Sequence, residues 1–161
     1  ITAHESFGVD ITSAELCNDL VNLGMGYNKS YSDLHIPEMP YNLIRHFIRG
    51  YFDGDGCITV WLSKEKGKSD RVRGKFDVCA KSASILNEFI KFFAIHDIKV
   101  NLNYLKRDDM YRMSTSSRKE LEKIYNILYR DSNFYLSRKF NKFSHYVNTE
   151  VTQLIVEYRN A

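Results

Sequence analysis

The chain has 161 residues, of which 43% are hydrophobic and 14% aromatic, so it can bury the core of one domain and is not a generally disordered protein. Its 23 Lys and Arg residues and 20 Asp and Glu residues give a net charge of +3, which is only a weak indication of a polyanionic partner. No apolar run approaches the roughly 20 residues of a membrane span, and the widely separated cysteines lack the spacing of a zinc site or a disulfide framework, which favours an intracellular, reducing compartment.

The N-terminal segment is predicted to form a helix followed by a linker. Thr12 and Glu15 have the spacing of a capping box, and three leucines recur at helical intervals before Gly24. Residues 24–40 are rich in Gly, Asn, Ser and Pro, which makes them the best candidate for a linker. The chain begins at Ile1 with no initiator Met and no signal-peptide pattern, so we expect this end to be a cut inside a longer protein.

A second helix and a hairpin are expected next. Pro40 occupies the predicted first helical position, and an apolar stripe runs from Leu43 to Tyr51 before a glycine-rich stop. Two runs of alternating apolar and polar residues, joined by the polar turn 64–70, predict an antiparallel hairpin with one buried face. The buried positions are expected to be Ile58, Val60 and Leu62 on the first strand and Val72, Phe76, Val78 and Ala80 on the second.

The second half of the chain continues with further helices and strands. Apolar residues at helical spacing predict a helix from about Ser84, strands are expected at 99–106 and 110–115, and another helix covers 121–128. Weaker helical patterns lie at 135–147 and 151–158. Counted from Pro40, the order of elements is αββαββα, which is an α+β fold.

A faint internal repeat relates the start of the chain to its later part. Residues 11–13, a leucine-bearing helix and residues 28–30 are similar to residues 113–117, the helix at 121–128 and residues 137–139. We interpret residues 1–36 as the tail of a preceding repeat plus a linker, and residues 37–161 as one repeat with C-terminal helices. Chance similarity between short segments is the alternative.

The segment 48–56 is the most informative for chemistry. Asp53 and Asp55 stand one glycine apart at the end of a helix, where the helix dipole is negative and a cation would offset two carboxylates. Mg²⁺ suits such a place because it takes oxygen ligands and commonly uses one or two carboxylates with water and phosphates. Gly50 and Gly54 share one helical face, on which a second helix could approach closely. A solvated, glycine-capped turn is the alternative.

The hairpin also predicts a basic strand face. Strands that present basic and polar side chains can enter the DNA major groove and read base edges. The candidates for base contacts are Thr59, Trp61, Arg73, Lys75, Asn101, Asn103, Arg112 and Ser114, and the neighbouring basic residues are Lys64, Lys66, Lys68 and Arg71. Residues 112–142 hold eight Lys and Arg against three Asp and Glu, which suits contacts to phosphates. A solvated strand face, and core packing for Trp61, are the alternatives.

The segment 48–56 resembles the motif of the LAGLIDADG homing endonucleases. It matches both acidic positions and both glycines of the family's nine-residue motif, has Gly54 at the small position between the acids, and departs from the motif at Arg49, where a small residue is usual. Residues 46–58 look like the second motif of two-copy members, upstream positions such as Lys29 look like the tail of their first copy, and residues 135–139 are similar to the late basic element.

The resemblance implies an αββαββα fold in which a four-stranded antiparallel sheet forms a DNA-binding saddle and the motif helix packs on that of a second repeat. In the family the second acid binds metal together with the preceding backbone carbonyl, positions that are Asp55 and Gly54 here. A catalytic lysine of the late basic element corresponds to Lys139, its counterpart in the preceding copy to Lys29, and Lys81 matches a polar position near the active-site water loosely. Asp53 is expected to support the helix end.

The implied function is site-specific cleavage of double-stranded DNA, with Mg²⁺ as cofactor, Mn²⁺ able to substitute and Ca²⁺ able to bind without supporting cleavage. The second acid would come from the missing N-terminal part, from a partner chain or from a second copy, and without it the chain would be inactive. The gene would lie in an intron, an intein or a free-standing frame. A rival interpretation is a non-cleaving nucleic-acid-binding protein of the same fold, either an intron maturase or a DNA-binding regulator, although Asp55 argues against pure binding.

Overall fold

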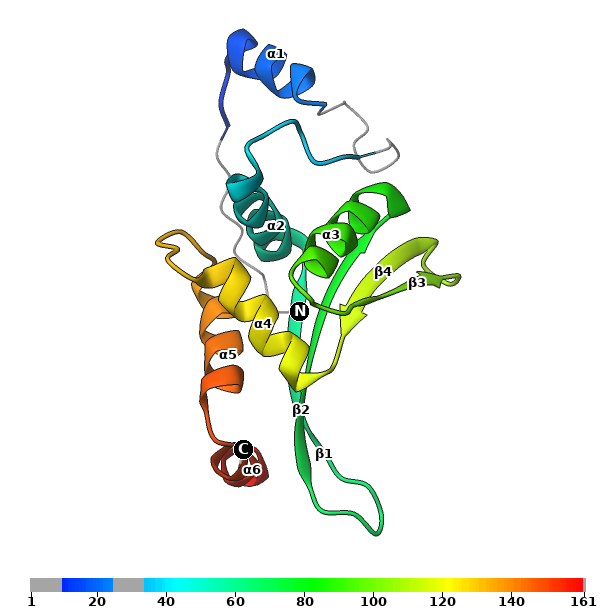
Figure 1. Cartoon of the computed structure of the whole chain (residues 1–161), viewed down its shortest axis with the longest axis vertical. Coiled ribbons are helices and arrows are strands. Elements are labelled where there is room, and N and C mark those ends of the chain that lie inside the picture. Colours follow the sequence, from blue (N-terminus) through cyan, green and yellow to red (C-terminus); the bar gives the residue numbers. More distant parts are fainter. Residues whose placement is uncertain (1–9, 25–33, 161) are drawn as a thin grey trace, which may run out of the picture.

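The computed structural model describes residues 10–24 and 34–160 and shows helices packed on one face of a four-stranded antiparallel sheet (Figure 1). The sheet has the order β1-β2-β4-β3. Its strands are β1 Cys57–Ser63, β2 Arg71–Ala80, β3 Asn101–Leu105 and β4 Met110–Thr115. The helices are α1 Ala14–Asn22, α2 Tyr41–Asp55, α3 Ala83–Ile95, α4 Arg118–Tyr129, α5 Ser137–Asn148 and α6 Val151–Asn160. The predicted order αββαββα, from α2 to α4, is therefore confirmed.

Alternation along the strands divides the sheet into a covered face and an open face. On β2, Val72, Gly74, Phe76 and Val78 are buried, while Arg73, Lys75 and Asp77 between them are exposed or half-buried. Successive side chains of a strand point to opposite faces, so the apolar set faces the helices and the polar set faces away from them. Within the described residues, no helix has both the length and the apolarity that crossing a bilayer requires.

Aromatic rings from three helices and β2 form the centre of the core. Phe52 of α2 stacks on Phe76 of β2 with a centroid distance of 4.6 Å, and Phe93 of α3 and Phe143 of α5 each lie 6.3 Å from Phe76. All four rings are fully buried. Because Phe52 lies in the last turn of α2, this packing fixes the end of that helix over the sheet.

Two predicted helix starts were wrong. The residue that caps α1 is Ser13, not Thr12: its backbone is extended, and its hydroxyl accepts a hydrogen bond from the backbone N–H of Leu16 at 3.2 Å. Pro40 has extended backbone and precedes α2, so it caps the helix instead of occupying its first position. The predicted core stripe of α2 also differs, because Leu43 is 44% exposed while Phe52 is fully buried.

Side chains from distant elements account for two further differences. The strand expected at 99–106 spans only Asn101–Leu105, and the backbone N–H of Lys99 donates to the Glu120 carboxylate instead of a strand partner. The helix expected from residue 135 begins at Ser137, because the N–H of Leu136 donates to the Asp53 carboxylate.

Candidate active site and nucleic-acid interface

The end of α2 presents two acids in different environments. The Asp53 carboxylate accepts hydrogen bonds from the Tyr129 hydroxyl at 2.7 Å and from the Leu136 N–H at 3.0 Å. The Asp55 side chain is exposed, and within residues 10–24 and 34–160 it has no hydrogen-bonded or ion-paired partner. Asp53 therefore joins α2 to α4 and to the start of α5, while the oxygens of Asp55 remain available to a ligand.

The buried ammonium of Lys139 closes the same helix end. Its Nζ donates to the carbonyls of Phe52 at 2.7 Å and Asp53 at 2.8 Å, and more distantly to that of Gly54 at 3.4 Å. The last carbonyls of a helix have no intrahelical partner and carry the negative end of the dipole, so a cation is favoured there. Burial and then Arg138 lower the pKa of Lys139, whereas the nearby acids raise it. The structure thus brings Lys139, Gly54 and Asp55 together, as the sequence predicted.

Two motif positions have local explanations. A Cβ atom at Gly56 would lie 2.2 Å from the Phe52 ring, so glycine allows α2 to turn directly into β1. Arg49, which departs from the family motif, is only 9% exposed. Its guanidinium donates to the Leu128 carbonyl at 3.1 Å, and this bond joins α2 to α4. It also donates to Nδ1 of His46 at 2.6 Å, within α2.

An open face of α2 carries both interface glycines. Gly50 and Gly54 are exposed, and among the described residues no atom beyond the helix's own neighbouring backbone lies within 4 Å of a Cβ added at either of them. Gly50 and Asp55 line one cavity of about 550 Å³, together with apolar residues such as Leu20 and Leu23 on the α1 side. A second helix docked on Gly50 would therefore lie next to Asp55.

A smaller cavity adjoins the same helix end. It has a volume of about 230 Å³ and is lined by Gly54, Lys139 and the exposed cations Arg138 and Lys142, among others. Across the part of the chain that the structure describes, no three His, Cys, Asp or Glu side chains converge to hold a metal ion. This chain therefore offers a metal one carboxylate without a protein partner and a backbone carbonyl, which is a partial set of ligands.

The strand register places the predicted base-contacting residues on the open face of the sheet. Directly paired residues of neighbouring strands point to the same face. The pairs are Thr59 with Lys75, Trp61 with Arg73, Asn101 with Ser114, and Asn103 with Arg112. The β2–β4 pairing of Asp77 with Ser114 and of Cys79 with Arg112 continues this face across the sheet.

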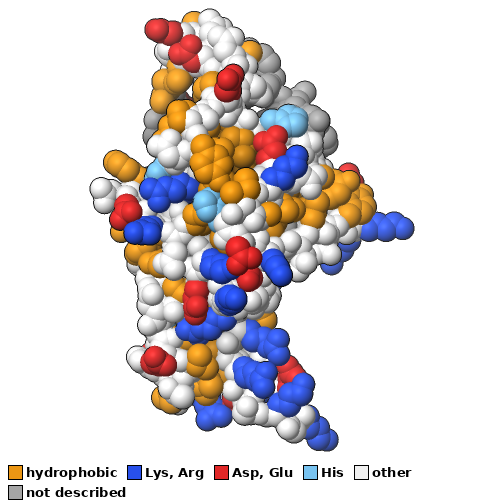
Figure 2. Space-filling model, in the orientation of Figure 1, with side chains coloured by type: hydrophobic (Ala, Val, Ile, Leu, Met, Phe, Trp, Pro, Cys, Tyr) orange, Lys and Arg blue, Asp and Glu red, His pale blue; other side chains and the backbone are white. Residues whose placement is uncertain are grey.

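The hairpin turn extends the basic surface beyond the body of the molecule. Figure 2 shows Lys and Arg side chains gathered over the β1–β2 hairpin at the lower end of the view. Glu65 in the turn accepts hydrogen bonds from Lys68 at 2.6 Å and Arg73 at 2.8 Å, and these cations lower its pKa. The remaining turn candidates, Lys64 and Lys66, and Arg71 on β2 are exposed.

Of the other predicted catalytic lysines, Lys81 does not join this group. Lys81 follows β2, and its ammonium donates to the carbonyls of Asp108 at 3.1 Å and Asp109 at 3.0 Å, so it holds the β3–β4 turn. Lys29 lies outside the described residues. Sequence reasoning missed Tyr129, whose position in the apolar stripe of α4 gave no sign of its bond to Asp53. Burial and that bond raise the pKa of Tyr129.

Comparison with known families now decides the classification. Residues 48–151 match the model of the LAGLIDADG endonuclease family. The chain belongs to the LAGLIDADG endonuclease family. The matched residues run from the start of the motif in α2 through the whole sheet to the beginning of α6, and no curated protein matches this LAGLIDADG chain.

Solved LAGLIDADG structures share the fold. The homing endonuclease I-CvuI, in complex with the I-CreI target and 2 mM Mg, is 18% identical, with a TM-score of 0.56 over 74% of this chain and 70% of that one. The group I intron-encoded I-CeuI, complexed with DNA, is 11% identical, with a TM-score of 0.58 over 92% of this chain and 76% of that one. I-GzeII, in complex with its DNA target, is 22% identical, with a TM-score of 0.53 over 71% of this chain but only 42% of its own.

Proposed function

We propose that this LAGLIDADG chain is one repeat of a site-specific, metal-dependent endonuclease of double-stranded DNA and supplies half of its active site. The observation that carries this proposal is the position of Asp55. Its carboxylate has no protein partner within the described residues, and it lines the cavity formed on the Gly50 face of α2. A second motif helix on that face would bring a second acid beside Asp55.

A divalent cation fits Asp55 and the Gly54 carbonyl. The one hydrogen bond of that carbonyl to Lys139 is long, at 3.4 Å, and a carbonyl oxygen has a second lone pair. Mg²⁺ commonly uses one or two carboxylates with water and phosphates, and Mn²⁺ shares its preference for oxygen. A cation bound there would activate a water and stabilise the leaving oxygen of a phosphodiester. Solved I-CvuI complexes with DNA in the presence of Mg or Ca support the use of divalent ions.

The residues of this chain would act around that cation. Asp53 holds the end of α2 through Tyr129 and Leu136. The Lys139 ammonium, fixed on the last carbonyls of the helix, would offset negative charge at the scissile phosphate. Arg138 and Lys142, at the rim of the adjoining cavity, would contact the neighbouring backbone phosphates.

The open face of the sheet would lie in the major groove. Arg73, Asn101, Asn103 and Arg112 carry the donors and acceptors that read base edges, and the lysines of the β1–β2 turn would contact phosphates. In the free protein Arg73 is paired with Glu65 and Lys75 lies 3.5 Å from Asp77. Exchange of these partners for guanine edges would favour particular base sequences, whereas exchange for phosphates would strengthen binding to any sequence.

The second repeat would come from sequence before Ile1, from a partner chain or from a second copy. No residue of α1 is buried, as expected of an element that belongs with a preceding repeat. That this chain spans less than half of I-GzeII also supports a larger active unit. Residues 1–36 would then be the tail of that repeat and residues 37–161 the complete one.

Selection and cleavage of a duplex test this proposal. The chain would be used to select tightly bound duplexes from a randomised library, and the selected duplex would then be incubated with the chain and Mg²⁺, Mn²⁺ or Ca²⁺. At concentrations at which light scattering shows the chain to be paired, we expect cleavage with Mg²⁺ and Mn²⁺ and binding alone with Ca²⁺. Tight binding without cleavage by the paired chain in any of the three would favour the non-cleaving DNA-binding protein instead, and preference for RNA over duplex DNA would favour a maturase.

A further inference from the structure

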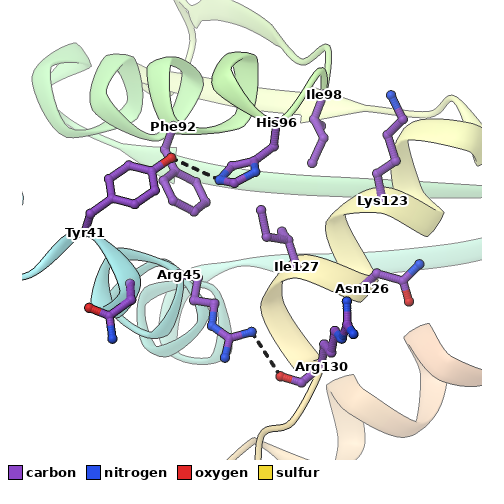
Figure 3. A pocket seen from close by; sticks show the side chains of 10 residues that line it. Tyr41, Arg45, Phe92, His96, Ile98, Lys123, Asn126, Ile127 and Arg130 are labelled. Carbon is purple, nitrogen blue, oxygen red and sulfur yellow. Dashed lines mark hydrogen bonds between the residues drawn. The ribbon is translucent and has the colours of Figure 1, made fainter.

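We propose that a cavity between α2, α3 and α4 binds one nucleotide through its base and its phosphate. The three helices pack on the covered face of the sheet, so the cavity is separate from the open face and from the Asp55 end of α2 (Figure 3). Its volume is about 580 Å³, within the range of roughly 300–1,000 Å³ that is typical of small-molecule sites. Nothing in the proposed endonuclease function uses it.

One wall of the cavity is an aromatic platform. Phe92 and Ile98 form a buried floor, and the rings of Tyr41 and His96 lie beside it, with the Tyr41 and His96 planes 27° apart and their centroids separated by 6.2 Å. The Tyr41 hydroxyl and Nε2 of His96 are hydrogen-bonded at 3.1 Å, which fixes both rings (Figure 3). Tyr41 is 51% exposed, so its ring is accessible for a planar base to stack on it.

Three cations surround the cavity, one on α2 and two on α4 or directly after it. Arg45 comes from α2, Lys123 from α4, and Arg130 directly follows α4. Lys123 is paired with Asp97 at 2.7 Å, and Arg130 with Asp131 at 3.5 Å. Both members of the second pair are more than three-quarters exposed, so that pair is weak and leaves Arg130 able to bind another anion.

Arg45 is the cation that most needs an anion. Within residues 10–24 and 34–160 it has no acidic partner, and its Nη1 donates at 3.3 Å to the carbonyl of Arg130, which holds the guanidinium at the cavity (Figure 3). Burial is the main cause that lowers the pKa of the neighbouring His46 and Arg49, and the charge of Arg45 lowers both further. A phosphate would neutralise this excess charge and accept two hydrogen bonds from the planar guanidinium.

The rim adds groups that can read a base. Asn42 and Asn126 are exposed amides that line the same cavity. An amide offers both a donor and an acceptor, which matches the polar edge of a nucleobase. Platform, amides and guanidinium together suit a nucleotide better than an acidic peptide, which would leave the platform and the amides without partners.

Calorimetric titration of the full chain with adenosine 5′-monophosphate, adenosine and inorganic phosphate tests the site. We expect the nucleotide to bind at least about tenfold more tightly than either half alone, because only the nucleotide engages both the platform and the cations. Arg45→Gln and Tyr41→Ala should each weaken nucleotide binding by about tenfold. The matched control is Arg107→Gln. Arg107 lies in the β3–β4 turn with its side chain 96% exposed, so this variant should bind the nucleotide as the wild type does.

Equal affinity for phosphate and nucleotide would overturn the proposal, and so would nucleotide binding that both cavity variants leave unchanged. A short single-stranded oligonucleotide added as competitor distinguishes the source of the nucleotide. If it displaces adenosine 5′-monophosphate, the site binds an unpaired nucleotide within a strand; if it does not, the site binds a free nucleotide. Asp55→Asn should bind the nucleotide as the wild type does, so this result is independent of the endonuclease proposal.

Discussion

Asp53 and Asp55 are separated by one glycine, yet within the described residues only the Asp53 side chain is hydrogen-bonded. Asp53→Asn would set an amide against the Leu136 N–H or the Tyr129 hydroxyl, and should lower the free energy of unfolding by about 1–3 kcal/mol. Asp55→Asn should change it by less than about 0.5 kcal/mol, because that side chain is exposed and has no partner within the described residues. Urea denaturation of both variants would show the difference. Equal effects on stability would contradict the division of roles.

Lys139 is expected to serve both stability and activity. Lys139→Met would leave the last carbonyls of α2 buried without their cation, and should lower the free energy of unfolding by about 1–3 kcal/mol. Lys142 lies on the same helix, is exposed and lines the same small cavity, so Lys142→Met is a matched control with little expected effect on stability. Thermal unfolding measures the stability of both variants. A Lys139→Met variant as stable as Lys142→Met would show that the ammonium does not hold the helix end.

His46 should make stability depend on pH. Burial first, and then Arg49 and Arg45, lower the pKa of His46 below its ordinary value of 6.5. The unfolded chain therefore binds a proton at a higher pH than the folded chain does, and the contribution of His46 to stability is lost as the pH falls from about 6.5 through the folded pKa. His46→Gln should remove this part of the pH dependence and leave the profile above about pH 7 unchanged. Denaturation midpoints of the wild type and the variant, measured across pH, would show this difference. If the midpoints of both proteins changed with pH in parallel, His46 would not be the cause of the pH dependence.

The sequence indicates which motif residues lie near one another, but it does not show the partners that support them. Asp55, Gly54 and Lys139 were predicted because the motif and the late basic element have recognisable residue types, and the structure brings them together. Tyr129 could not be predicted, since an aromatic residue in an apolar stripe does not show which distant carboxylate its hydroxyl will meet. Arg49 could be noticed as a departure but not explained until α4 was in place.

At the scale of elements, the open face of the sheet should determine DNA specificity. Arg73→Ala should weaken binding of the selected duplex by about 1–3 kcal/mol and binding of random duplex much less, because a base contact is lost. Lys91 is exposed on α3, in the helix layer, so Lys91→Ala is the control and should bind both duplexes as the wild type does. Gel-shift titration with both duplexes distinguishes a base contact from a phosphate contact. An equal loss on both by Arg73→Ala would mean that this residue contacts only phosphate.

Strands were easier to predict than helix ends for a physical reason. The alternation of β1 and β2 is local and follows directly from which side chains are apolar, so their faces were predicted correctly. The start of α5 and the length of β3 depend on Asp53 and Glu120, which lie far from them in sequence. Leu43 belongs to an apolar stripe yet is exposed, because α2 buries mainly Ile48, Arg49 and Phe52 against the rest of this chain.

At the scale of the whole molecule, the Gly50 face is a surface of α2 that the described residues leave open. Gly50→Ala should raise the free energy of unfolding of the monomer by about 0.5–1 kcal/mol, since alanine favours a helix and the described part of the chain puts no other atom within 4 Å of the added Cβ. The same change should weaken pairing with a second repeat, because the helices could no longer approach as closely. Denaturation of dilute protein measures the first effect, and light scattering of concentrated protein measures the second. Unchanged pairing would place the interface on another face.

The sequence could not show which surfaces of the folded chain stay open. The exposed apolar residues of the α1 region, among them Leu16 and Leu23, and the space beside Gly50 and Gly54 that the described residues leave open become visible only in the structure. They fit a molecule that functions with a second repeat. A whole-chain net charge of +3 likewise conceals the concentration of Lys and Arg over the hairpin (Figure 2).

The most direct test of the central claim is cleavage of the selected duplex with Mg²⁺ by wild type and Asp55→Asn side by side, at concentrations where the chain pairs. The account predicts cleavage by the wild type that a chelator abolishes, and no cleavage by an Asp55→Asn variant that remains folded and still binds the duplex. Equal cleavage by both proteins, or tight binding without cleavage by a wild-type chain that light scattering shows to be paired, would contradict this claim.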